Sequence, residues 1–270
     1  MEFAEEDIRQ SIPARFEKVA QICADRLAIK MGDRRLTYGE LNRYANRIAG
    51  GIQRALGPEV EPVALLFENG IDAVAAIFAV LKSGKFLVAL DASVPPERNK
   101  YILEDLQARA ILTDNRSSSL VPALTHREPV LLNIDAIDES SACDNLGSSV
   151  ASENFALIQY TSGSTGEPKG VVQTHQNILH SVFLHSRRSQ ICADDRLTFL
   201  QDRSSRRWCS RARATNSFDP AGEAHGLLKQ KTRKFVSVVA EQNRRRARKD
   251  GGRIGPKSDC LAYIGTYGPI

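Results

Sequence analysis

The chain alternates short, almost wholly apolar runs with longer segments in which apolar residues recur at helical spacing. The apolar runs predict strands at residues 63–67, 86–90, 110–113, 129–134 and 155–160, and shorter strands at 27–30 and 34–37. Helical spacing predicts helices that begin after Ser11 and at residues 39–56, 71–81, 97–107 and 177–188. Strands that are apolar on both faces are typical of parallel sheets covered by helices, so the order predicts an α/β fold built from βαβ units.

One segment between two predicted strands has the composition of a phosphate-binding loop. The apolar run 155–160 leads into glycines, hydroxyl side chains and one lysine, and Val171 and Val172 resume a strand. Glycines let backbone amides approach an anion, hydroxyls donate hydrogen bonds, and a lysine adds a mobile positive charge. The candidate nucleotide-binding residues are Thr161, Ser162, Gly163, Ser164, Thr165, Gly166, Lys169 and Gly170.

This loop differs from the P-loop of nucleotide triphosphatases. The spacing Gly-x4-Gly-Lys-Ser/Thr is absent, and the loop is followed by a predicted strand rather than by a helix. Hydroxyls, loop amides and Lys169 would therefore hold the phosphates without a helix N-terminus behind them. On composition alone, an ordinary solvated hairpin loop rich in glycine and serine is the alternative.

Residues 160–170 resemble the signature loop of the AMP-forming adenylating enzymes, which comprise acyl-CoA synthetases, luciferases and the adenylation domains of nonribosomal peptide synthetases. Residues 36–41 resemble the first core motif of adenylation domains, and residues 81–91 resemble the second. The chain is most similar to the amino-acid-activating domains. This resemblance implies a layered, parallel-sheet βαβ subdomain of the large N-terminal domain, truncated, with residues 1–200 as a partial AMP-binding domain.

The resemblance also implies a reaction and its participants. Enzymes of this family join a carboxylate to ATP, which gives an acyl-adenylate and pyrophosphate, and Mg²⁺ is expected to share the phosphate charge. Phosphopantetheine on a carrier protein domain is the expected later acceptor. The family's catalytic and substrate-pocket residues belong downstream of residue 200, where nothing matches. The catalytic residues are therefore unknown, and we expect this chain alone to be inactive.

Three other polar residues attract a specific interpretation. Glu40 and Lys82 lie in the two core motifs, and we expect them to be a solvated pair of helix residues without a catalytic role. His175 follows the second strand of the predicted hairpin and could line a substrate cleft. A histidine that is hydrogen-bonded near the start of a helix is the alternative, and we favour it.

The net charge of +5 is concentrated in residues 201–270, whereas residues 1–200 are net acidic. From Gln201 onward the sequence shows no strand alternation and no helical face. One interpretation is a basic nucleic-acid-binding tail on a non-catalytic nucleotide-binding or interaction module. A disordered basic tail and translation out of the original reading frame are the others. We favour the last, and do not expect nucleic acid as a partner.

The remaining composition restricts the environment of the protein. The N-terminal residues are acidic, and no apolar run approaches the roughly 18 residues of a membrane span, so we expect a cytoplasmic protein. The five cysteines are scattered without a Cys-x2-Cys pair, which predicts neither a disulfide framework nor a zinc site. We assign no metal-ligating residue.

Overall fold

The computed structural model describes residues 3–68, 70–125, 128–138, 143–147, 149–162, 168–191, 195–201 and 207–212. The chain divides into two compact units, of which the larger contains residues Ala4–His180 and the smaller contains Phe3 and the described residues from Ser181 onward. Among the described residues, no helix is long and apolar enough to cross a membrane.

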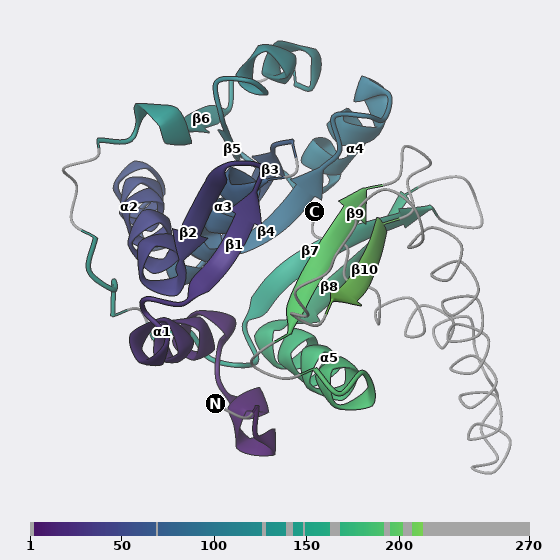
Figure 1. Cartoon of the computed structure of the whole chain (residues 1–270). Helices are drawn as coiled ribbons and strands as arrows, with labels where there is room; N and C mark the ends of the chain where they lie inside the picture. Colours follow the sequence, from purple (N-terminus) through teal and green to yellow (C-terminus); the bar gives the residue numbers. More distant parts are fainter. Residues whose placement is uncertain are drawn as a thin grey trace, which may run out of the picture. The chain divides into compact units, whose positions relative to one another are not determined.

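The larger unit is built on a six-stranded sheet with the order β6-β5-β3-β4-β7-β8. The first five of these strands are parallel to their neighbours, and β8 runs antiparallel to β7 at one edge. The strand bounds are β3 (Pro62–Leu66), β4 (Phe86–Leu90), β5 (Ala110–Thr113), β6 (Val130–Asn133), β7 (Phe155–Ser162) and β8 (Pro168–Thr174). The prediction of parallel βαβ units is therefore confirmed (Figure 1).

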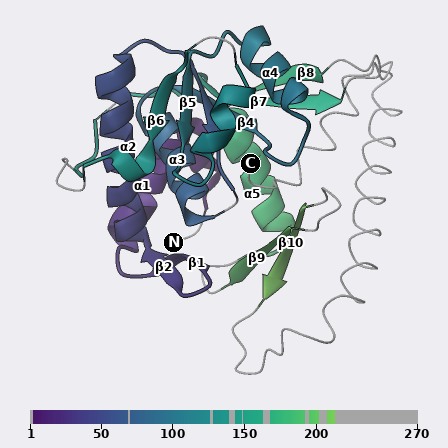
Figure 2. The same cartoon turned by 90° about the horizontal axis from the view of Figure 1, so that it is seen from above.

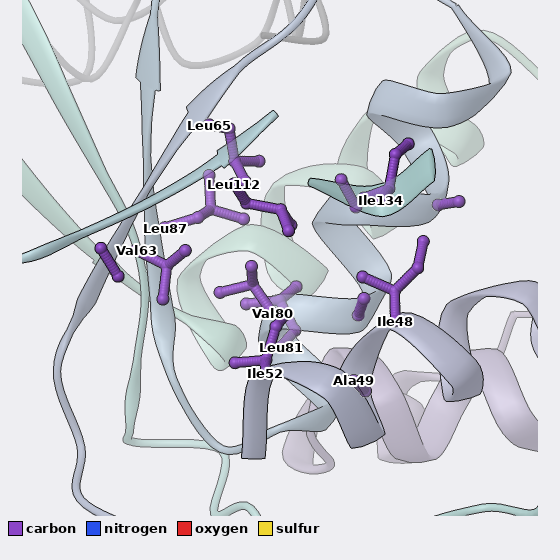
Figure 3. Packing of buried hydrophobic residues seen from close by; sticks show 14 of the residues in the cluster. Ile48, Ala49, Ile52, Val63, Leu65, Val80, Leu81, Leu87, Leu112 and Ile134 are labelled. Carbon is purple, nitrogen blue, oxygen red and sulfur yellow. The ribbon is translucent and has the colours of Figure 1, made fainter. Parts of the chain in front are cut away.

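Helices cover both faces of this sheet. On one face, α2 (Tyr38–Leu56) and α3 (Ile71–Lys82) pack against every second residue of β3, such as Val63 and Leu65 (Figure 3). On the other face α4 (Pro96–Asp105) packs against the alternate residues, such as Ala64 and Leu66. Side chains of a strand point alternately to its two faces, so the unbroken apolar runs in the sequence follow from a sheet that is buried on both sides.

The elements that precede the sheet also follow from local signals. Helix α1 (Ile12–Ile22) begins where the Ser11 hydroxyl accepts a hydrogen bond from the backbone N–H of Ala14. Strands β1 (Leu27–Met31) and β2 (Arg34–Thr37) form a separate antiparallel pair. Thr37 then caps α2 in a reciprocal arrangement with Glu40, whose carboxylate accepts the backbone N–H of Thr37. Short 3-10 helices lie at η1 (Glu5–Arg9), η2 (Ser118–Ala123) and η3 (Ile134–Ala136).

Lys82 differs from the expected solvated partner of Glu40. Glu40 is exposed at the start of α2, whereas only 1% of the Lys82 side chain is exposed, at the end of α3. The Lys82 ammonium forms an ion pair with Glu17 on α1 and lies 5.8 Å from the centre of the Phe16 ring. Burial lowers the pKa of Lys82, and the Glu17 carboxylate opposes this shift. The expected pair is therefore wrong, and Lys82 joins α3 to α1.

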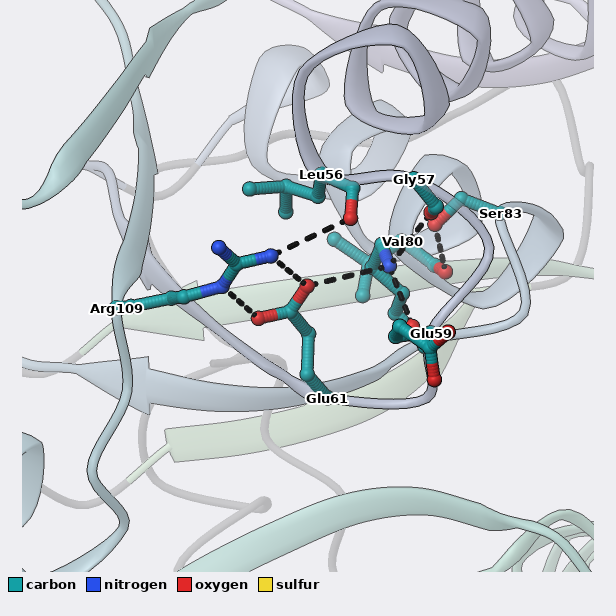
Figure 4. Close-up of polar contacts among 8 residues, drawn as sticks. Leu56, Gly57, Glu59, Glu61, Val80, Ser83 and Arg109 are labelled. Carbon is teal, nitrogen blue, oxygen red and sulfur yellow. Dashed lines mark hydrogen bonds and ion pairs between the residues drawn. The ribbon is translucent and has the colours of Figure 1, made fainter.

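A second buried lysine lies at the amino ends of three central strands. Glu61, Lys85 and Arg109 immediately precede β3, β4 and β5, so the parallel register brings them together. Figure 4 shows Glu61 facing Arg109. The Lys85 ammonium donates to the backbone oxygens of Gly57 and Glu59 at 3.1 and 2.6 Å, and lies 3.5 Å from a Glu61 carboxylate oxygen. Arg109 binds the same carboxylate through Nε and Nη2, which lowers the pKa of Glu61. These contacts link the amino ends of β3, β4 and β5.

The smaller unit contains an antiparallel pair formed by β9 (Arg196–Gln201) and β10 (Arg207–Ala212). Trp208 pairs with Leu200, and Ala212 pairs with Arg196. Strand β10 thus forms in a segment whose sequence shows no strand alternation, and it pairs with β9 along its whole length. Residues 213–270 lie outside the described part of the chain.

Candidate functional site

The candidate site is the hairpin formed by β7 and β8. Strand β7 runs parallel to β4, with Leu87 opposite Leu157 and Val88 opposite Ile158. Its end therefore points toward the carboxyl edge of the sheet, the edge at which Asp91 follows β4. In open α/β sheets this edge is where ligands bind. The two predicted strands that flank the loop are confirmed, since β8 returns antiparallel to β7.

The described part of the hairpin includes only some of the candidate residues. Thr161 pairs with Lys169, and the backbone of Ser162 pairs with that of Pro168. The Lys169 residue is exposed, and the Thr161 hydroxyl donates to the backbone oxygen of Lys169 at 3.4 Å. Four of the predicted residues lie outside the described residues, namely Gly163, Ser164, Thr165 and Gly166. The binding roles of all eight stay predictions.

Gly170 has a packing role that the sequence did not reveal. It lies opposite Tyr160 in the hairpin, and a Cβ atom at this position would be 3.2 Å from Ile158 Cγ2 and 3.3 Å from Tyr160 Cζ. Contacts this short require the neighbour to move, so the missing side chain makes room for the Tyr160 ring. An aromatic ring over a glycine on the neighbouring strand is a recognised way of stabilising a hairpin.

Tyr160 was also not predicted as part of the site. Its ring packs against the buried cluster beneath α4, and its hydroxyl donates a hydrogen bond to the carboxylate of Asp105, the last residue of α4. Burial and this acceptor both raise the pKa of the Tyr160 phenol, so the phenol is protonated at neutral pH. The apolar run gave a signal for the strand, but none for a partner that is 55 residues away.

Asp91 is the polar residue that ends the neighbouring strand. One of its carboxylate oxygens accepts hydrogen bonds from the backbone N–H and the hydroxyl of Ser93, at 2.8 and 2.6 Å. The buried Asn99 side chain bonds the backbone N–H and oxygen of Asp91, which fixes the turn into α4. Within the described part of the chain, no group of three or more His, Cys, Asp or Glu residues could hold a metal ion.

His175 occupies the first position of α5 (His175–Arg188), and the structure supports the favoured interpretation of this residue. Its side chain is completely buried, and Nδ1 accepts a hydrogen bond from the backbone N–H of Ile12 at 3.3 Å. Nε2 therefore carries the proton of the neutral ring, and it has no hydrogen-bond partner among the described residues. His175 thus joins the start of α5 to the start of α1, and we assign it no contact with substrate.

Burial lowers the pKa of His175 to about 4, which predicts a pH-dependent stability. An unfolded chain has a histidine pKa of about 6.5, so below that pH the unfolded state binds a proton that the folded state excludes. Stability is therefore present in full above pH 6.5 and is lost as the pH falls toward 4. Urea unfolding at pH 7 and pH 5 should show a loss of about 2 kcal/mol that depends on His175.

The matched variant is His175→Gln, which keeps a polar side chain but does not titrate in this range. Its free energy of unfolding should fall by clearly less than that of the wild type between pH 7 and pH 5, because the histidine contribution is missing. An identical decrease in both proteins would show that His175 does not titrate as its burial predicts.

Known proteins resemble this chain both in sequence and in fold. The family model described as AMP-binding enzyme matches residues 16–203. Surfactin synthase subunit 1 of Bacillus subtilis (strain 168) is 37% identical over 173 residues, which cover 64% of this chain and 5% of that protein. Tyrocidine synthase 1 of Brevibacillus parabrevis is 37% identical over 180 residues, which cover 66% of this chain and 16% of that protein.

A solved structure shows the same fold. The AMPPNP-bound form of the nonribosomal peptide synthetase FmoA3 is 28% identical and has a TM-score of 0.63, with 69% of this chain and 20% of that chain covered. The chain thus spans only a small part of the length of the relatives that it matches.

Proposed function

Since the chain belongs to the AMP-binding enzyme family, we propose that it is part of an enzyme that uses ATP to convert a carboxylate into an acyl-adenylate, with release of pyrophosphate. The expected family and fold class are confirmed. We further propose an amino acid as the carboxylate, because the relatives include surfactin and tyrocidine synthases. A cytoplasmic location is part of the same proposal.

The observation that supports this proposal best is the position of the β7–β8 hairpin. The hairpin points toward the carboxyl edge of a mainly parallel sheet, with Lys169 exposed next to its loop. In adenylate formation the carboxylate attacks the α-phosphorus, so catalysis depends on positioning the triphosphate and neutralising the charge of the departing pyrophosphate. An exposed ammonium and a glycine-rich loop next to it are suited to this work.

The described residues offer groups that could bind ATP, but none that is assigned to Mg²⁺ or to phosphopantetheine. The Lys169 ammonium and the Thr161 hydroxyl are suitable donors to phosphate oxygens, and we propose that they bind the triphosphate with Ser162, Gly163, Ser164, Thr165, Gly166 and Gly170. The described residues contain no cluster that fits Mg²⁺, so no ligand is assigned to that ion. Phosphopantetheine on a carrier domain is proposed as the later acceptor by analogy with the relatives.

We propose that residues 201–270 do not follow the family pattern because they are translated out of the original reading frame. The match to the family model ends at residue 203, which supports this boundary. The alternative of a non-catalytic module with a nucleic-acid-binding tail has no supporting observation in the described part of the chain. The test is to translate the underlying DNA in the other two frames after codon 199. If neither frame encodes a further adenylation-domain motif, the proposal is wrong.

The activity itself is tested by ATP–pyrophosphate exchange. We expect the 270-residue chain to show no exchange with any amino acid or fatty acid, since the residues that bind the carboxylate in this family belong after residue 200. A chain with a restored continuation past Leu200 should exchange with at least one amino acid. Exchange by the 270-residue chain would contradict the proposed inactivity, and a restored chain that exchanges with no carboxylate would contradict the proposed reaction.

A further inference from the structure

The end of the β7–β8 hairpin has little support from the rest of the sheet. Strand β7 pairs with β4 only at Leu157 and Ile158, whereas its pairing with β8 continues to Ser162. Beyond Ile158 the hairpin is therefore a two-stranded ribbon within the described residues. A two-stranded ribbon is only marginally stable in water, so its position depends on whatever side chains attach it to the fold.

Tyr160 lies in this ribbon and connects it to two other elements. Its ring covers Gly170 on β8, where a Cβ atom would come within 3.3 Å of Tyr160 Cζ and 3.5 Å of its hydroxyl. The same ring packs against the buried cluster beneath α4, and the hydroxyl donates to the Asp105 carboxylate. Figure 2 shows α4 beside the hairpin. One side chain thus joins β7, β8 and α4.

The next pair of residues along the ribbon belongs to the candidate phosphate site. Thr161 follows Tyr160 and pairs with Lys169, and the Thr161 hydroxyl donates a long hydrogen bond of 3.4 Å to the backbone oxygen of Lys169. This contact is weak, so it does little to fix the ribbon. The hydrogen bond between Tyr160 and Asp105 involves an ionised acceptor, which makes it stronger than a neutral one.

We propose that Tyr160 and Asp105 are positioning residues that hold the loop end of the β7–β8 hairpin, and so set the affinity of the chain for the triphosphate of ATP. Neither residue touches the nucleotide. The hydrogen bond lowers the population of hairpins in which the Thr161–Lys169 pair is open. The effect on ATP rests on the proposed function, whereas the effect on the hairpin itself does not.

Hydrogen–deuterium exchange of the full chain tests the effect on the hairpin. In Tyr160→Phe the ring still covers Gly170 while the hydroxyl is lost, and in Asp105→Ala the acceptor is lost. Either change should accelerate amide exchange in the peptide that contains Thr161 and Lys169 by about fivefold, as expected for loss of one hydrogen bond whose acceptor is exposed to water. The double variant should exchange no faster than either single variant, because both remove the same contact.

Two control variants separate this bond from a general loss of packing. Asp105→Asn keeps a side-chain oxygen that can accept from the phenol but removes the charge, so its exchange should lie between that of the wild type and that of Asp105→Ala. Tyr101→Phe removes a different phenol hydroxyl, four residues before Asp105 on the same helix, and leaves both partners of the Tyr160–Asp105 hydrogen bond in place. This variant should exchange as the wild type does. Unchanged exchange in Tyr160→Phe would overturn the inference.

Equilibrium binding of ATP to the same variants tests the link to the nucleotide. The dissociation constant should rise by a factor similar to the acceleration of exchange in Tyr160→Phe and Asp105→Ala, and should not change in Tyr101→Phe. Faster exchange with unchanged ATP affinity would overturn the positioning role. Absence of ATP binding by the wild type would contradict the proposed function instead. The effect of the Tyr160–Asp105 hydrogen bond on the hairpin would then be judged by the exchange rates alone.

Discussion

Replacement of Lys85 by methionine should destabilise the full chain by about 3 kcal/mol, the loss that follows removal of one partner from a buried ion pair. The Lys85 side chain has no exposed surface, and its ammonium binds three acceptors. Methionine is of similar length but cannot donate. The backbone oxygens of Gly57 and Glu59 and one oxygen of Glu61 would lose their donor at the amino edge of the sheet.

Urea unfolding at pH 7 measures this loss, and Arg109→Met is the matched control. Arg109 binds the same Glu61 carboxylate, but 57% of its side chain is exposed, so water can replace it and the loss should be much smaller. A Lys85→Met chain that unfolds at the wild-type urea concentration would show that the buried ammonium contributes no net stability. Equal losses in both variants would show that the Glu61 carboxylate, rather than the burial of Lys85, determines the effect.

The sequence predicted the strands and helices of the larger unit well because both faces of its sheet are buried. Runs such as Val63–Phe67 and Phe86–Leu90 contain no polar residue, and the observed strands differ from them by at most one residue at either end. The helical stripe in residues 39–56 likewise became α2. In these segments local spacing and tertiary burial favour the same structure, so a pattern in the sequence is sufficient.

Sequence patterns could not reveal contacts between distant segments. A lysine at the end of a helix or before a strand is usually exposed, and only the sheet register and the position of α1 show that Lys82 and Lys85 are buried. The partner of Tyr160 is determined by the packing of α4 beside β7. In the same way, the arginine-rich segment Arg207–Ala212 is a strand because β9 pairs with it.

The candidate site was proposed from the residue types of one loop, and the fold adds the position of the two strands that flank this loop. The residue types of the loop predicted a phosphate-binding function, but they did not indicate where the loop lies. The parallel pairing of β7 with β4 supplies this information, because it directs the loop toward the edge at which Asp91 follows β4. The contribution of Gly170 to packing required the structure, since its neighbour across the hairpin is known only from the register.

Replacement of Lys169 by alanine should weaken the binding of ATP by about ten- to a hundredfold, since a hydrogen bond to a charged group contributes about 1.5–3 kcal/mol. The exposed ammonium is proposed to contact phosphate oxygens, so its loss should hardly affect AMP, which lacks the β- and γ-phosphates. Lys30→Ala is the matched control, because it removes one exposed lysine from β1, in a different sheet. It should leave the affinity for both nucleotides unchanged.

The most direct test of the phosphate-binding hairpin is therefore the ratio of the dissociation constants of AMP and ATP, measured by titration calorimetry of the full chain in the presence of Mg²⁺. We predict that the wild type binds ATP more tightly than AMP, and that Lys169→Ala reduces this preference while Lys30→Ala retains it. Equal affinities of the wild type for the two nucleotides, or an unchanged preference in Lys169→Ala, would contradict the assignment of this hairpin to the triphosphate.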